Sequence, residues 1–108
     1  MSWFIRAAAV MGIICLGFTP RLRADSGADL YKSNCVICHG SDASGNTALG
    51  KKNKVRDLKS PEVQKATDAE LADAISKGKK PMPAFADRLK PEQIHEIVEY
   101  LRELAKKK

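Results

Sequence analysis

The sequence has few aromatic residues, few cysteines and no apolar run long enough to cross a membrane. Among its 108 residues are one Trp, two Tyr, three Phe and three Cys. The charge-free stretch 7–18 has twelve residues, whereas a transmembrane helix requires about 20. These absences exclude a chain built around membrane-spanning helices, and they leave few aromatic side chains for a core.

The N-terminal residues are typical of a secretory signal peptide. Arg6 precedes the apolar stretch 7–18, and Ala24 is a small residue at which a signal peptidase could cut. We therefore expect a signal peptide at 1–24 and a single domain at 25–108. The protein would then be periplasmic or otherwise exported.

The fate of this N-terminus has alternatives. Leu22 is larger than the residue usual two positions before a cut, so the cleavage site stays open. A lipoprotein anchor at Cys15 is a second possibility, although Ile14 stands where such sites favour a small residue. A retained N-terminal tether is the third.

Removal of residues 1–24 changes the composition. Three arginines and no acidic residue are lost, so the net charge falls from +6 to +3. The remaining part holds two cysteines, one methionine, and three aromatics at Tyr31, Phe85 and Tyr100. A domain of this size buries only a modest part of its surface. We therefore expect its folded state to need additional stabilisation from a metal or a covalent cofactor.

Residues 35–39 read Cys-Val-Ile-Cys-His, the attachment signature of c-type haem. On a helix, Cys38 and His39 lie three and four residues after Cys35, so both sulfurs and the imidazole project from one side. One porphyrin can therefore bind all three. We predict thioether bonds from Cys35 and Cys38 to one haem c, with neutral His39 as an axial iron ligand.

Two other kinds of site remain as alternatives. A structural zinc site needs four ligands, usually in two pairs, and only His39 and the distant His95 could add nitrogen ligands to the cysteines. A thioredoxin-like dithiol belongs at a strand-to-helix turn. No run of β-branched residues precedes Cys35 after residue 24.

The local patterns are helical throughout, which predicts an all-α fold. The first helix should run into the cysteine motif, a polar glycine-containing loop should occupy 40–53, and no strand is expected. The last helix has one apolar stripe, with His95, Glu99, Arg102 and Lys106 on its polar side. N-capping or proline signals place helix starts at Ser26, Ser60, Thr67 and Pro91.

Met82 is the second residue to which we assign chemistry. It lies between Pro81 and Pro83, which predicts an extended and restricted loop. A methionine commonly just fills a gap in a core. Beside a haem, the thioether of Met82 becomes the favoured axial ligand opposite His39. His95 and an open or water-bound position are the alternatives.

The haem motif, the Met-Pro-x-Phe segment and the amphipathic last helix together resemble class I c-type cytochromes, over residues 25–108. The resemblance implies a small fold of about four to five short helices around one covalent haem. It also implies that the first and last helices cross closely, Gly27 with Tyr31 meeting Ile97 with Tyr100. The sequence departs from the family pattern at residues 46–50, which lack the proline that many members carry after the motif. This proline would help to hold the loop rigid.

With His39 and Met82 on both axial positions, no site is open for a substrate. We therefore expect a soluble one-electron carrier and not an enzyme. A haem-based sensor with an open sixth position and an electron-transfer subunit of a larger oxidoreductase remain as alternatives.

Basic residues cluster in the loop region after the motif and just before Met82. We expect a monomer that meets acidic-surfaced redox proteins or membrane oxidoreductase complexes, and no nucleic acid. A solvated surface without a docking role is the alternative. The lysines concerned are Lys51, Lys52, Lys54, Lys79 and Lys80.

Overall fold

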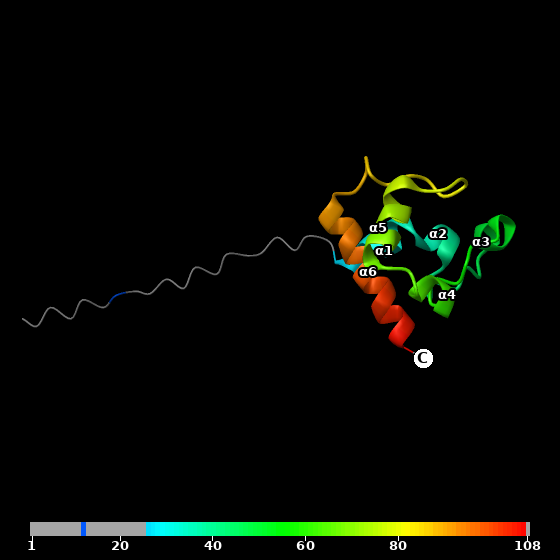
Figure 1. Ribbon diagram of the computed structural model, residues 1–108, viewed down its shortest axis with the longest axis horizontal. Helices are drawn as coiled ribbons and strands as arrows, with labels where there is room; N and C mark the ends of the chain where they lie inside the picture. Colours follow the sequence, from blue (N-terminus) through cyan, green and yellow to red (C-terminus); the bar gives the residue numbers. More distant parts are fainter. Residues whose placement is uncertain (1–11, 13–25, 108) are drawn as a thin grey trace, which may run out of the picture.

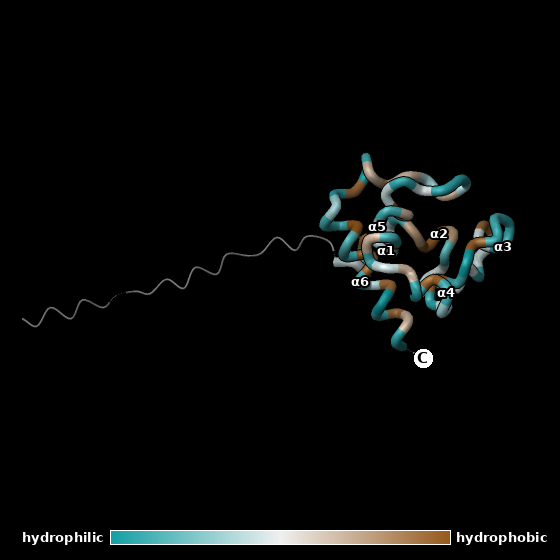
Figure 2. Tube along the Cα trace, viewed as in Figure 1, coloured by the Kyte–Doolittle hydropathy of each residue, from teal (hydrophilic) through white to brown (hydrophobic). Residues whose placement is uncertain are grey.

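The last helix, α6 (Pro91–Lys106), carries the apolar stripe predicted for it. Apolar and polar segments alternate along α6 in Figure 2, and Ile94, Ile97, Val98 and Leu101 are buried. The computed structural model describes residue 12 and residues 26–107. The signal peptide predicted at 1–24 therefore lies, apart from Gly12, outside the described residues.

The described residues form helices and no strand, apart from an isolated bridge between Lys79 and Met82, and the predicted all-α fold is confirmed. α6 packs against α1 and α5, while α2 contacts α1 and α3 (Figure 1). None of the helices within 26–107 is long and apolar enough to cross a membrane. The helices before α6 are α1 (Gly27–Asn34), α2 (Val36–His39), α3 (Ala48–Asn53), α4 (Pro61–Gln64) and α5 (Asp68–Lys77).

The predicted helix starts are confirmed. The side chains of Ser26 and Ser60 accept hydrogen bonds from the first turns of α1 and α4. Thr67 and Glu70 form a complete capping box at the start of α5. These caps satisfy backbone N–H groups that have no partner inside the helix.

Residues 26–107 contain six helices, more than the four to five expected, for two reasons. The first helix does not run unbroken into the motif, because the backbone changes direction at Cys35 (φ −118°, ψ −29°). The stretch 40–53, predicted to be a loop, contains α3. Thr47 caps α3 by accepting from the N–H of Gly50, and glycine at that position lacks the acidic or amide side chain that marks a capping box.

α1 and α6 cross closely, as the resemblance implied. A Cβ at Gly27 would overlap the backbone carbonyl of Glu96 and would lie 3.1 Å from the Cβ of Tyr100. The rings of Tyr31 and Tyr100 pack 5.4 Å apart at 51°. Glycine is therefore required at the crossing because any side chain would push the two backbones apart.

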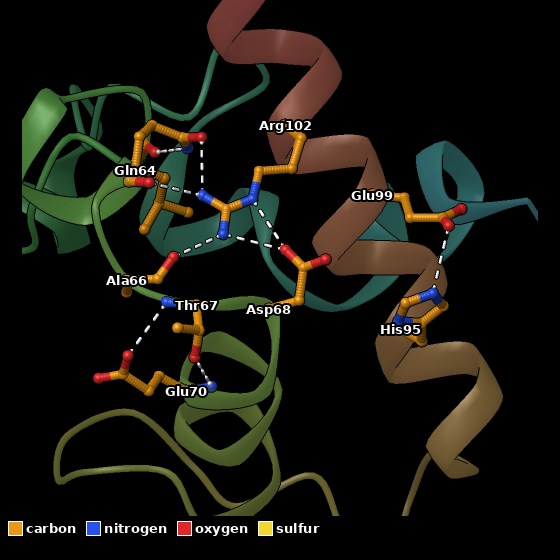
Figure 3. A network of polar contacts seen from close by, with 9 residues as sticks. Gln64, Ala66, Thr67, Asp68, Glu70, His95, Glu99 and Arg102 are labelled. Atoms are coloured by element: carbon orange, nitrogen blue, oxygen red, sulfur yellow. Dashed lines mark hydrogen bonds and ion pairs between the residues drawn. The ribbon is translucent and has the colours of Figure 1, made fainter.

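Arg102 ties α6 to the link between α4 and α5 (Figure 3). Its guanidinium donates to the Gln64 backbone carbonyl at 2.9 Å, the Ala66 carbonyl at 2.6 Å and Asp68 at 3.0 Å. The polar side predicted for the last helix does not leave Arg102 in solvent, because these contacts keep its side chain only 24% exposed. His95 and Glu99, on the same predicted polar side, do lie in solvent as an exposed pair.

Candidate functional site

All four residues to which the sequence assigned chemistry line one cavity. It has a volume of about 640 Å³ and is bordered by Cys35, Cys38, His39 and Met82. That volume falls in the usual range for cofactor pockets, about 300–1,000 Å³. Much of the remaining wall is apolar, from Ile37, Val55, Leu58, Val63, Pro81, Pro83 and Phe85.

The motif reaches this cavity through a short, bent stretch of helix. The N–H of Cys35 still donates to Tyr31 at the end of α1, at 2.8 Å. The carbonyl of Cys35 then accepts from the N–H groups of both Cys38 and His39, at 3.3 and 3.0 Å. The turn thus formed brings the two thiols and the imidazole to the same cavity, as the spacing predicted.

Burial shapes the chemistry of His39. It lowers the pKa of the imidazole below its ordinary value, so the ring is held neutral, the form that binds a metal. Its Nδ1 atom is buried without a hydrogen-bond partner among the described residues. Since buried polar atoms are normally paired, His39 has the character of a side chain whose bonding is completed by a group in the cavity.

Met82 is held by a tight turn and not by the extended segment predicted from its prolines. The N–H of Met82 donates to the carbonyl of Lys79 at 2.7 Å, and the reverse bond is 3.1 Å. The Lys80–Pro81 peptide bond between them is cis. The turn is closed by the two backbone hydrogen bonds between Lys79 and Met82, and not by Pro83 alone.

The turn is fixed to the end of α5. The N–H of Phe85 donates to the carbonyl of Ile75 at 3.1 Å. Gly78, with φ +63°, lets the chain pass close to Pro83, because a Cβ there would lie 2.6 Å from the Pro83 carbonyl. In Figure 1 the segment between α5 and α6, in yellow, loops out above α2. The loop thereby brings the thioether of Met82 to the wall that faces the motif's cavity.

Positive charge surrounds the cavity. Lys54, Lys79 and Lys80, three of the five lysines predicted to meet partners, line it and are exposed. Lys51 and Lys52 are exposed on α3 and do not line it. Arg56 and Arg88 complete the cationic lining, and no Asp or Glu among the described residues contributes to it.

His95, the rival iron ligand, does not reach this site. It lies on α6, pairs with Glu99 at 3.2 Å (Figure 3) and does not line the cavity. Within the described part of the chain, no three His, Cys, Asp or Glu side chains come together as a metal-binding group.

Sequence reasoning missed two residues at the site. Arg88 lies over the ring of Phe85, 5.7 Å from its centre, and both border the cavity. Thr47 donates from its hydroxyl to the carbonyl of Cys38 at 2.7 Å. Neither has a local signal: Arg88 is one basic residue among many, and Thr47 is recognisable only once α3 is known to begin there.

Known proteins share this sequence and fold. A family model described as "Cytochrome C oxidase, cbb3-type, subunit III" matches residues 22–101. Cytochrome c6 of Nostoc sp. is 35% identical, with 90% of this chain and 89% of that protein covered. Cytochrome c6 of Thermosynechococcus vestitus is 32% identical, with 96% and 93% covered.

Two further relatives differ in how much they share. The cbb3-type cytochrome c oxidase subunit FixP of Azorhizobium caulinodans is 35% identical over 82% of this chain, which corresponds to 29% of that subunit. The solved KustC0563 c-type cytochrome has a TM-score of 0.67 and 32% identity, covering 74% of this chain and 98% of its own.

An all-α fold around a cavity that carries Cys-x-x-Cys-His is the architecture of a small c-type cytochrome. The chain belongs to the monohaem c-type cytochromes, in the family of the cytochromes c6 and the cbb3-type oxidase subunit III domain. Membership implies a covalently bound haem c. The chain is an electron carrier and not an enzyme.

Proposed function

We propose that the chain carries single electrons on one haem c, which Cys35 and Cys38 bind through thioethers and His39 and Met82 ligate from opposite sides. The observation that supports this most directly is that all four side chains border one cavity of about 640 Å³. When bound, the haem supplies a one-electron ferric/ferrous couple. The two axial ligands leave no open position for a substrate.

The residues of the chain adjust that couple in identifiable ways. The neutral imidazole of His39 is ready to bind iron because burial lowers its pKa. A thioether from Met82 favours the reduced state relative to a second histidine. The backbone bonds between Lys79 and Met82 restrain the turn that would present this thioether to the iron.

The dithiol alternative has less support than haem attachment. Burial raises the pKa of the Cys35 thiol to about 11. The nucleophile in dithiol chemistry is the thiolate, and a thiol with this pKa is almost wholly protonated near neutral pH. Cys35 is better suited to a permanent covalent bond than to repeated exchange.

We also propose that the protein is exported, with residues 1–24 as its signal peptide, and that it meets its partners as a soluble monomer. The cationic rim of Lys54, Lys79 and Lys80 would guide an acidic redox partner toward the haem edge. Ile37, 70% exposed and also bordering the cavity, offers an apolar contact inside that rim.

A second candidate is an electron-transfer subunit of a larger oxidase. It is favoured by the family model, which is described as subunit III of cbb3-type cytochrome c oxidase. Co-purification of the tagged protein with an integral membrane oxidase would support this role, whereas recovery of the protein alone would support the free carrier.

The decisive experiment compares absorption spectra of the haem-loaded wild type with those of Met82→Ala. We expect the oxidised wild type to show the weak far-red band of an iron–methionine bond, and Met82→Ala to lose it and to bind carbon monoxide when reduced. Leu58→Ala, which truncates another side chain of the same cavity, should keep the band. If the wild type lacks the band and binds carbon monoxide readily, the protein is a haem sensor and the proposed carrier function is wrong.

A further inference from the structure

Three consecutive carbonyl groups at the end of α2 each accept a hydrogen bond from a different part of the chain. The hydroxyl of Thr47 donates to Cys38 at 2.7 Å, and the N–H of Gly45 donates to His39 at 2.7 Å. The hydroxyl of Tyr31 donates to Gly40 at 2.6 Å, in a buried position. We call Tyr31, Gly45 and Thr47 the carbonyl clamp.

The clamp matters because α2 cannot hold its own shape. A helix of four residues is too short to be stable alone, and its last carbonyls have no partner inside the helix. The three donors come from α1, from the turn after the motif and from the first residue before α3. The end of α2 is therefore fixed in position by its neighbours.

Thr47 also connects the clamp to α3. Its oxygen accepts from the N–H of Gly50 at 2.8 Å while its hydrogen is donated to Cys38. A Cβ at Gly50 would overlap the carbonyls of Gly45 and Cys38, so α3 packs directly on the backbone of the motif. This packing holds the loop that lacks the expected proline.

We propose that the carbonyl clamp orients the imidazole of His39 toward the haem, with Tyr31 and Thr47 as positioning residues. The inference rests on the proposed ligation by His39. A metal-bound histidine is usually oriented by a hydrogen bond to its other ring nitrogen. The hydrogen bonds to the carbonyls of Cys38, His39 and Gly40 add to this by fixing the backbone from which the imidazole projects.

The test compares Tyr31→Phe and Thr47→Val with Tyr100→Phe in the haem-loaded protein. Tyr100 belongs to the same aromatic stack, and its hydroxyl makes no hydrogen bond to the described residues, which makes it a matched control. The readouts are the g values of the ferric iron by electron paramagnetic resonance and the hyperfine shifts of the haem methyl groups, which report ligand orientation. Hydrogen exchange of the Gly45 amide reports the clamp directly.

We expect Tyr31→Phe and Thr47→Val to change the g values and methyl shifts, and to speed exchange at Gly45 about fivefold, the effect of losing one buried neutral hydrogen bond. Tyr100→Phe and Thr47→Ser should resemble the wild type, the latter because it keeps the hydroxyl. If Thr47→Val fails to accumulate, Tyr31→Phe against Tyr100→Phe decides.

Two failures can be told apart. If Tyr31→Phe matches Tyr100→Phe in every readout, the clamp does not position His39 and the inference is wrong. If His39→Ala keeps the wild-type ferric spectrum, His39 is not the ligand, and the proposed function itself fails.

Discussion

Burial is the main influence on the chemistry of single side chains at this site. It raises the pKa of the Cys35 thiol to about 11 and lowers the pKa of His39. It also raises the pKa of the Tyr31 hydroxyl above its ordinary value of 10. Each shift favours the uncharged form. For His39 this is the form that ligates iron, and for Tyr31 it is the form that donates to Gly40.

The raised pKa of Tyr31 predicts a loss of stability in alkali. A group whose pKa is raised on folding stabilises the protein fully below its unfolded value, here 10, and loses that contribution as the pH rises toward its folded value. We expect the free energy of unfolding to fall above pH 10, and to fall less steeply in Tyr31→Phe. Denaturant titrations at a series of pH values measure this.

Tyr100→Phe is the control for the alkaline effect and should stay closer to the wild-type curve than Tyr31→Phe does. The prediction concerns the difference between curves, in which effects common to all three proteins cancel. Parallel curves for wild type and Tyr31→Phe from about pH 9 to 12 would contradict it.

At the scale of helices, Arg102 joins two segments that are far apart in the sequence. We expect Arg102→Leu to lower the free energy of unfolding by about 2 kcal/mol, because hydrogen bonds from a charged group are lost and carbonyls lose their partner. Arg102→Lys should also be destabilising, since an ammonium cannot match the planar fork. Thermal and denaturant unfolding provide the measurement.

His95→Ala is the matched control for Arg102, because it removes the exposed pair with Glu99 from the same helix. The side chains of that pair are 57% and 63% exposed, so its loss should change stability by less than about 0.5 kcal/mol. Equal effects of the two substitutions would show that the Arg102 contacts do not hold α6 in place.

The start of α3 predicts a stabilising substitution. Ala48 is its first residue, where proline is favoured, and the N–H of Ala48 donates to no described residue. Thr47 before it is extended (φ −132°, ψ 165°), as a residue before proline must be. We expect Ala48→Pro to stabilise the protein by about 0.4–1 kcal/mol, by restricting the unfolded chain.

The control for Ala48→Pro is Ala74→Pro, inside α5, which should cost about 3 kcal/mol or more. Denaturant unfolding of both variants distinguishes the two positions. A loss of stability with Ala48→Pro would show that this end of α3 needs its backbone N–H or a different φ.

At the scale of the whole molecule, the charges are unevenly distributed. The cavity is bordered by cationic residues, while α6 carries exposed acidic residues and contributes nothing to the cavity wall. We expect Lys54→Glu, Lys79→Glu and Lys80→Glu together to slow reduction of ferricyanide at least about tenfold at low salt. Stopped-flow spectroscopy measures the rate.

A control with the same change in net charge reverses three exposed lysines away from the cavity, Lys32, Lys65 and Lys106. Its effect should be clearly smaller, and the difference between the triple variants should shrink near 1 M salt, where the screening length is about 3 Å. A cationic cobalt complex should instead react faster with the first variant. Identical rates for both triple variants would mean that total charge alone governs the encounter.

Much of the fold was predictable because its signals are local. Caps at Ser26, Ser60 and Thr67 mark helix starts by side chains only a few residues from the backbone groups they bind. The sequence did not predict α3 because Gly50 stands where a capping box has an acidic or amide residue. The break at Cys35 was missed because nothing in the neighbouring residues requires it.

The sequence by itself determined the chemistry, because Cys35, Cys38 and His39 are close by spacing alone. The helix signals likewise depend on residues only a few positions apart, and the family resemblance rests on the order of such local motifs along the chain. Only the tertiary structure decided that Met82 faces the same cavity from a closed turn, that Arg102 is a tie between helices, and that Tyr31 and Thr47 hold the end of α2. The physical reason is distance along the chain. A cap or a motif is made within a few residues. The hydrogen bond from Tyr31 joins residues nine apart, and that from Arg102 to Gln64 joins residues 38 apart. Such contacts depend on how the helices pack.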